Sequence, residues 1–194
     1  IIISILKKNK FITFFGVFYI FLYLGIGVVQ ENRAEKLGKS IAIMRGHESK
    51  RLTVKPSLGN LFLWKAIYED NGFYYVDAVR LLSKTEYCQG TKIKKLNASN
   101  NFMELNQNSQ QYKDIERFNW FSQGYLGVGT QKNIITDVRY SAVPNEVDGL
   151  WGIQINPSKK NFEHVEWVVN RTSYKAKWKR FLDLLLGKGC KEIT

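Results

Sequence analysis

The stretch DVRYSAVPNEVDGLWG, which begins at Asp137, is the densest cluster of polar and aromatic residues in the sequence. Asp137 and Arg139 are two residues apart, so on a strand their side chains share one face and could form an ion pair. Glu146 and Asp148 are carboxylates that could serve as a general acid or base. The cluster predicts a charged pocket or, the alternative that we favour, ion pairs and turn contacts around Pro144. Six side chains are involved: Asp137, Arg139, Tyr140, Glu146, Asp148 and Trp151.

Metal ligands are scarce in this sequence. His47 and His164 are its two histidines, and neither has a second ligand three or four residues away. His164 and Glu166 share a face of a predicted strand, which gives two ligands where a zinc site needs three or four. A Gly-rich phosphate loop and a nucleophile elbow are also missing from the sequence. We therefore expect no metal or cofactor site in this chain, and a solvent-facing strand edge at His164.

Cys88 and Cys190 are the two cysteines, and they lie far apart in the sequence. Their spacing is not that of a metal site or of a CxxC redox motif. One disulfide between them is possible, but the sequence favours two free thiols. On that interpretation the cysteines indicate no particular redox compartment.

An uncharged apolar run, FITFFGVFYIFLYLGIGVV, extends from Phe11 to Val29. A helix rises 1.5 Å per residue, so this run spans about 28 Å, close to the hydrocarbon thickness of a bilayer. It is longer than the apolar region of a typical signal peptide, and VVQENRAEK offers no small-x-small cleavage site. We therefore predict a retained transmembrane helix at residues 11–29, in preference to a cleaved signal or a buried core helix, and a lipid bilayer as partner.

The preceding residues 1–10, IIISILKKNK, are typical of the end of an apolar segment followed by a basic loop. We expect the chain to be the C-terminal part of a larger protein with further membrane helices; the alternative is a short hydrophobic N-terminus. More basic residues follow the span than precede it, which places the soluble part in the cytoplasm. A short basic loop before the span argues for the opposite side, and we follow the raw count.

The net charge of +12 is concentrated near the apolar run. Residues 1–55 hold ten of the 29 Lys and Arg residues but only three of the 17 Asp and Glu residues. Basic residues beside a membrane segment interact with anionic lipid headgroups and help to set orientation. The sequence has no nucleic-acid-binding motif, so nucleic acid is not an expected partner.

Residues 30–50 are predicted to form a juxtamembrane amphipathic helix that Gly46 ends. Its apolar residues recur at helical spacing: Ala34, Leu37, Ile41 and Met44.

Residues 51–194 are predicted to form a soluble domain. Alternating residues predict one strand over Asn60 to Glu69 and a return strand over Phe73 to Leu82. Asn71 and Gly72 between them suit a type I′ hairpin turn, because both central positions need positive φ. The polar residues 84–108 are expected to form a long connection without strands.

The second half of the domain alternates helices and strands. Ser109 is expected to cap a helix that ends at Gly124. Four strands are predicted in GYLGVGT, IITDVRYSAV, GLWGIQINP and HVEWVVNR. A C-terminal amphipathic helix should place four residues on one face: Tyr174, Trp178, Phe181 and Leu185. The predicted fold class is α+β, with one N-terminal transmembrane helix followed by a soluble domain with a mainly antiparallel sheet and two or three helices.

Four strings resemble a known family: KPSLGNLFLWKAIYEDNGFYYVDAVRLL, DIERFNWFSQGYL, DVRYSAVPNEVDGLWGIQI and HVEWVV. They are similar to the C-terminal soluble domain of longer bacterial inner-membrane proteins of a metal-dependent hydrolase family, whose founding members are described as LexA-binding. The resemblance covers most of residues 10–185. It implies a location in the bacterial inner membrane and a divalent metal in the full-length protein. The family's proposed metal ligands lie in an N-terminal multi-helix part, to which nothing in this chain corresponds.

Three hypotheses for function follow from these observations. The first is an accessory domain of such a hydrolase, which binds substrate or a partner near the membrane and is not catalytic alone. The second is a single-span, membrane-anchored binding module without hydrolase activity. The third is an enzyme with a site around Arg139 and Glu146.

Overall fold

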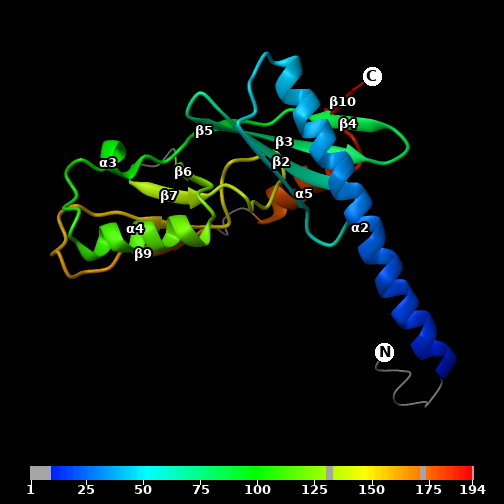
Figure 1. Ribbon diagram of the computed structural model, residues 1–194, viewed down its shortest axis with the longest axis horizontal. Helices are drawn as coiled ribbons and strands as arrows, with labels where there is room; N and C mark the ends of the chain where they lie inside the picture. Colours follow the sequence, from blue (N-terminus) through cyan, green and yellow to red (C-terminus); the bar gives the residue numbers. More distant parts are fainter. Residues whose placement is uncertain (1–9, 130–132, 171–173, 194) are drawn as a thin grey trace.

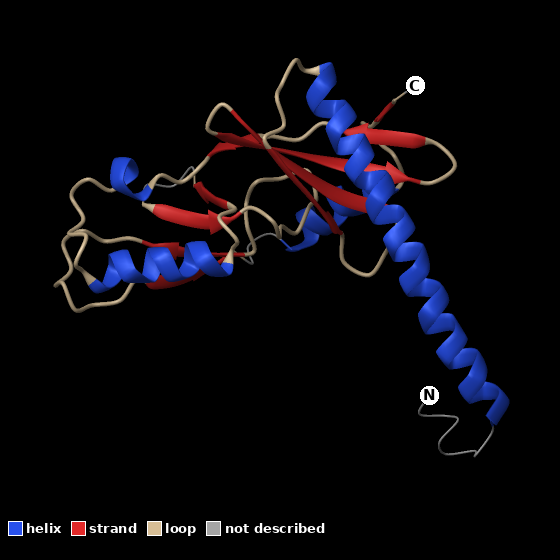
Figure 2. Ribbon diagram, viewed as in Figure 1, coloured by secondary structure: helices blue, strands red, loops and turns tan. Residues whose placement is uncertain are grey.

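The computed structural model describes residues 10–129, 133–170 and 174–193. A long helix crosses one face of an antiparallel sheet, and a second, smaller antiparallel sheet lies beside the first (Figures 1 and 2). The α+β class predicted from the sequence is therefore confirmed. The basic loop predicted before the apolar run falls almost entirely on residues 1–9, which lie outside the described part.

Helix α2 (Lys10–Met44) is a single helix of 35 residues. It joins without a break the two helices predicted at residues 11–29 and 30–50. It ends where the sequence predicts, because Gly46 adopts a positive φ of 69° and its N–H donates to the carbonyl of Ile43. Its apolar part is long enough to cross a membrane, and none of that window is buried within the chain.

The C-terminal part of α2 packs on the first sheet. Ala34, Leu37 and Ile41 are buried there, as the predicted apolar stripe requires, whereas Met44 is exposed. They contact an apolar sheet face formed mainly by Val54, Trp64, Ala66, Tyr68, Val79 and Leu81. The juxtamembrane segment therefore belongs to the core of the domain.

The first sheet has the order β1-β2-β3-β4-β10, with β5 also paired to β3. Its central hairpin is the predicted one: Asp70 pairs with Phe73, and Asn71 and Gly72 both have positive φ. The strands are β1 (Arg51–Pro56), β2 (Leu63–Asp70), β3 (Phe73–Leu81), β4 (Thr85–Cys88), β5 (Lys92–Lys94) and β10 (Lys191–Glu192).

The prediction of a strandless connection over residues 84–108 is wrong. This segment contains β4, β5 and the short helix α3 (Ala98–Asn101). The two strands are short: β4 has four residues and lies between β3 and the two-residue β10, and β5 has three residues. Only Cys88 and Ile93 turn inward from them to become buried, so the period-2 signal is too brief to recognise in the sequence.

The second sheet has the order β6-β7-β8-β9 and is antiparallel throughout. Helix α4 (Gln110–Phe121) packs on it through Ile115 and Phe118. The predicted cap is confirmed, since Ser109 accepts a hydrogen bond from the N–H of Tyr112 at 3.2 Å. The strands are β6 (Leu126–Val128), β7 (Ile134–Asp137), β8 (Trp151–Gln154) and β9 (Glu166–Val169).

Helix α5 (Tyr174–Leu185) packs on the first sheet through Phe181 and Leu184. They contact Leu63 and Ala78, whose side chains alternate with those that face α2, so α2 and α5 cover opposite faces. Of the predicted stripe, Phe181 is buried, Leu185 is partly buried and Trp178 is largely exposed. The side chain of Tyr174 lies outside the described part.

Cys88 and Cys190 form a disulfide, so the prediction of two free thiols is wrong. The two residues are 102 positions apart in the sequence. The antiparallel pairing of β4 with β10, in which Tyr87 faces Lys191, brings them together. The bond therefore depends on a strand pairing that the sequence alone did not indicate.

Candidate functional site

The polar cluster predicted at residues 137–151 surrounds a buried lysine that sequence reasoning did not select. Lys65 is 3% exposed, and its amine donates to Ser141 Oγ at 2.7 Å and to the carbonyl oxygen of Glu146 at 2.6 Å. On β2 it stands between Leu63 and Ile67, whose side chains are buried on the face opposite α2. A lysine at an inward position of an alternating strand is the signal that could have identified it.

Burial controls the charge of this lysine. Loss of hydration lowers the pKa of Lys65 from 10.5 to about 7, against the opposing effect of the carboxylates of Asp137, Glu146 and Asp148. The three carboxylates of the predicted cluster thus all favour the charged form of the same amine. A neutral amine beside a hydroxyl is the arrangement of a base and a nucleophile. Here, however, the Ser141 hydroxyl donates to the carbonyl of Val143 at 2.7 Å, so the contacts tie the loop to β2.

The predicted pair of Asp137 and Arg139 is an ion pair in the interior, but the predicted strand is shorter than expected: β7 ends at Asp137, and Arg139 lies in the turn that follows. Arg139 Nη2 lies 2.8 Å from Asp137 Oδ2, and both side chains are almost fully buried. The remaining guanidinium bonds go to Gln123 Oε1 and to the carbonyl of Phe121 at the end of α4. The hydrogen bond with Asp137 raises the pKa of Arg139. These contacts join β7 to α4, which is the structural role that the sequence favoured.

The other four predicted residues lie around this pair in different environments. Glu146 pairs with Arg180 of α5, while its second oxygen is buried without a hydrogen-bond partner among the described residues. Asp148 is exposed on the surface. The rings of Tyr140 and Trp151 contact each other with centroids 5.4 Å apart. Apart from Asp148, the predicted side chains therefore form three sets of contacts: the buried pair of Asp137 with Arg139, the pair of Glu146 with α5, and the contact of the two rings.

An open cleft of about 590 Å³ lies elsewhere, just beyond the end of α2. Arg45, His47, Tyr75 and Lys92 line it, together with the turn at residues 89–91. Its volume is typical of small-molecule sites. None of these residues is predicted as a site from the sequence, in which His47 is weighed only as a metal ligand.

The contacts within the cleft fix its side chains. Arg45 donates two hydrogen bonds to Asp77, at 2.7 and 2.8 Å, and this raises the pKa of Arg45. His47 Nδ1 is 2.8 Å from the hydroxyl of Tyr68, and its ring lies 4.5 Å from that of Tyr75. The rings of Tyr68 and Tyr75 stack 5.1 Å apart. The cleft therefore combines a rigid aromatic wall with cationic groups.

The described residues do not fit a metal centre. They contain no group of three or more His, Cys, Asp or Glu side chains close enough to share an ion. His164 lies just before β9, not in a strand, and its Nδ1 is 2.8 Å from Asp114 Oδ2 on α4. Its side chain is 67% exposed, so the pair is a surface contact between two elements.

Comparison of this chain with known protein families, with curated proteins and with solved structures finds no match.

Proposed function

We propose that this chain is the membrane-anchored C-terminal domain of a metal-dependent hydrolase of the bacterial inner membrane. Its role is accessory: it holds a substrate or a partner near the bilayer and is not catalytic alone. The observation that supports this is the continuity of α2, whose apolar part is fully exposed and whose next part lies in the core of the domain. The resemblance of the sequence strings supplies the hydrolase class.

The geometry of α2 suits such a positioning role. The residues from Ala34 to Ala42 are packed against the sheet, and no loop separates them from the apolar residues up to Val29. A flexible linker would let the domain drift over the membrane. With an unbroken helix, the domain would keep a fixed height and tilt relative to the span. Figure 1 shows the N-terminal half of α2 extending away from the sheets.

The test is the state of the protein in native membranes. We expect an immunoblot against the domain to find it in the pellet after alkaline carbonate extraction, in a band well above 22.5 kDa, the mass of this chain. A membrane band at 22.5 kDa would favour the single-span binding module instead. A band in the extracted supernatant would contradict the anchor.

Substitution of Glu146 separates the accessory role from the enzyme hypothesis. The ion-pair partner of Glu146 is the exposed Arg180, and the second carboxylate oxygen of Glu146 is buried without a hydrogen-bond partner among the described residues. Glu146→Ala should therefore leave the domain folded, and the hydrolytic activity of the membrane protein should not change. Loss of activity in a folded Glu146→Ala variant would favour an active site here. Arg139→Ala is a poor probe, because it would leave Asp137 charged, buried and unpaired.

We also propose that the domain lies on the oxidising, non-cytoplasmic side of the membrane. Disulfides persist in oxidising compartments, and Cys88 is bonded to Cys190. The charge count that favours the cytoplasm includes residues that the fold uses: Arg45 is bound to Asp77, and Arg51 lies over the ring of Tyr125. Such cations are weaker indicators of orientation than a short loop beside the span.

The cleft supports the second candidate function, a binding module. Lys92 and Tyr75 on its wall suit an anionic ligand with an aromatic ring, and phenyl phosphate is a suitable probe. If the cleft binds such ligands, phenyl phosphate should raise the melting temperature, and Lys92→Met should remove this shift. Lys94→Met on the same strand is the matched control, since Lys94 is exposed but does not line the cleft. Equal shifts in both variants would contradict binding at this cleft.

A further inference from the structure

The connection between β1 and β2, residues 57–62, lies beside the last turn of the apolar run. A Cβ atom placed on Gly27 would be 3.8 Å from Leu61 Cδ2. The side-chain amide of Gln30 donates to the carbonyl of Leu61 at 3.2 Å. Because Gly27 and Gln30 flank Val29, where the apolar run ends, this connection is held at the height at which α2 would leave the hydrocarbon.

This connection exposes large apolar side chains although its backbone is well fixed. Leu58 is 90% exposed and Phe62 is 45% exposed. The side-chain oxygen of Asn60 accepts hydrogen bonds from the N–H groups of Phe62 and Leu63, at 2.9 and 2.8 Å. The exposure is therefore built into an ordered turn. Figure 1 shows this turn below the first sheet, alongside α2 on the side of its free half.

We propose that the β1–β2 connection inserts Leu58 and Phe62 into the lipid headgroup region, as a second membrane contact beside α2. The inference rests on the proposed anchoring function, because it takes α2 as the span. Leu58 is three positions from Leu61 along the chain, a reach of at most about 11 Å. The headgroup region on each side of the hydrocarbon is about 5–8 Å thick, so the reach is sufficient.

A basic residue, Arg33, lies on α2 near the β1–β2 connection and would favour the same membrane contact. Arg33, one turn beyond Gln30, donates to the uncharged oxygens Gln30 Oε1 and Leu82 O, and neither of these partners is a carboxylate. A cation at this depth is attracted to anionic headgroups. The consequence is mechanical: a single helix leaves the domain free to rotate about the helix axis, and a second contact point fixes that rotation.

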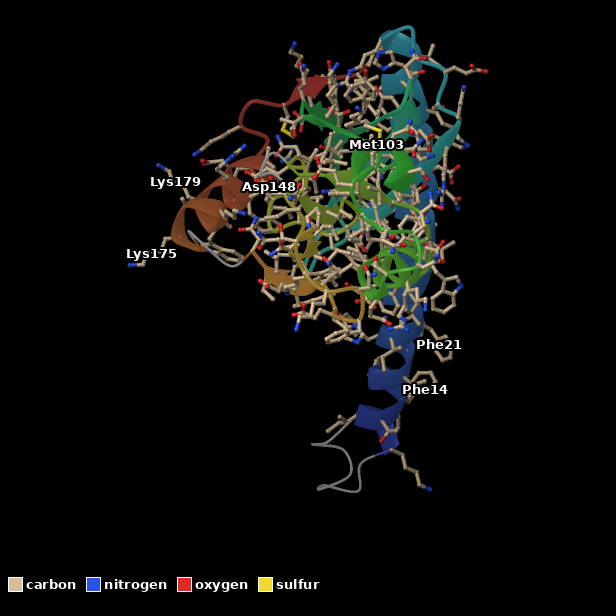
Figure 3. All side chains as sticks on the ribbon, turned by 90° about the vertical axis from the view of Figure 1, so that its left-hand side faces the viewer. Phe14, Phe21, Met103, Asp148, Lys175 and Lys179 are labelled. Atoms are coloured by element: carbon tan, nitrogen blue, oxygen red, sulfur yellow. A yellow bond between two sulfur atoms is a disulfide. The ribbon has the colours of Figure 1, made fainter. Side chains whose placement is uncertain are left out.

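The experiment measures the depth of single labels on the full chain in vesicles of phosphatidylethanolamine and phosphatidylglycerol. An environment-sensitive fluorophore is attached to cysteine variants under non-reducing conditions, so that Cys88 and Cys190 stay in their disulfide. Leu58→Cys and Phe62→Cys test the inference, Phe21→Cys reports on the span, and Met103→Cys is the matched exposed control. Phe21 is 70% exposed and Met103 is 83% exposed. In Figure 3 Phe21 lies on the free half of α2 and Met103 lies far from it, in the body of the domain.

We expect headgroup-attached nitroxides to quench the labels at Leu58 and Phe62 several-fold more strongly than the label at Met103, and acyl-chain nitroxides to quench the label at Phe21. If Phe21 is quenched while Leu58 and Phe62 behave like Met103, the second contact is overturned and the anchor stands. If Phe21 is not quenched, the anchor itself fails, and the inference fails with it.

Discussion

At the scale of single residues, folding lowers the pKa of the Lys65 amine by burying it. The amine of Lys65 is charged in the unfolded chain up to about pH 10.5, but in the folded chain its pKa is about 7. Below about pH 7 the amine is charged in both states. Between the two pKa values only the unfolded chain binds the proton, so the free energy of unfolding must rise with pH in this window, by up to about 1.4 kcal/mol per pH unit.

We therefore predict that the free energy of unfolding increases by about 2 kcal/mol between about pH 7 and about pH 9 on account of Lys65. The Lys65→Met variant should lose this part of the pH dependence, because it has no titrating amine. Urea unfolding followed by tryptophan fluorescence in detergent micelles measures the difference. Lys94→Met, at an exposed position, should retain the full dependence. An unchanged slope in Lys65→Met would show that the folded amine is not destabilised by burial.

The two ion pairs of the predicted cluster differ in burial. We therefore predict that breaking each pair lowers the free energy of unfolding by a different amount. Arg139→Ala removes the partner of Asp137, whose side chain is 1% exposed, and should destabilise the domain by about 3–5 kcal/mol. Arg180→Ala breaks the pair with Glu146, but Arg180 is 61% exposed, so the cost should be about 1 kcal/mol or less. Chemical denaturation of the two variants side by side measures both. Equal costs would contradict the structural role assigned to the buried pair.

At the scale of elements, α2 has two environments along one helix, and its glycines report on them. A side chain at Gly38 would meet Leu52 Cδ1 at 3.0 Å and the Cβ of Ala66 at 3.5 Å, whereas nothing lies within 4 Å of a side chain at Gly25. Close packing at Gly38 is what allows the helix to approach the sheet, and the apolar run makes no such contact at Gly25.

Gly38→Leu should therefore force α2 away from the sheet and destabilise the domain by about 1–3 kcal/mol. Gly25→Leu makes the same substitution on the same helix and should leave the unfolding of the domain unchanged. Thermal denaturation of both variants, followed by circular dichroism, compares them. If Gly25→Leu proves as damaging as Gly38→Leu, the apolar run is packed against protein and does not face lipid.

At the scale of the whole molecule, the membrane and the disulfide together predict which side the domain occupies. The only two cysteines are bonded to each other, so the wild-type chain offers no free thiol and Met103→Cys would introduce one. We expect a membrane-impermeant maleimide to label this variant in intact spheroplasts. Wild-type protein, which should remain unlabelled until it is reduced, is the control. Labelling of Met103→Cys only after lysis would place the domain in the cytoplasm and support the charge count.

The local elements were predictable because each depends on neighbouring residues. The length and hydropathy of the run from Phe11 to Val29 determine a helix long enough to span a bilayer. Asn71 and Gly72 determine the hairpin turn, and Ser109 determines the start of α4, since positive φ and capping are properties of a few adjacent residues. The ion pair of Asp137 with Arg139 was predictable for the same reason, because the two residues are only two positions apart in the sequence.

Only the tertiary structure decided which segments that are distant in the sequence contact each other. Lys65 and Ser141 are 76 positions apart and Cys88 and Cys190 are 102 apart, so their contacts follow from strand pairing and not from local pattern. Lys65 is buried because residues 138–146 and α5 pack on the same face of the first sheet, and this burial lowers the pKa of Lys65. The sequence by itself therefore determined the long apolar helix, the hairpin and the fold class. The disulfide, the buried amine and the docking of α2 required the whole chain to be folded.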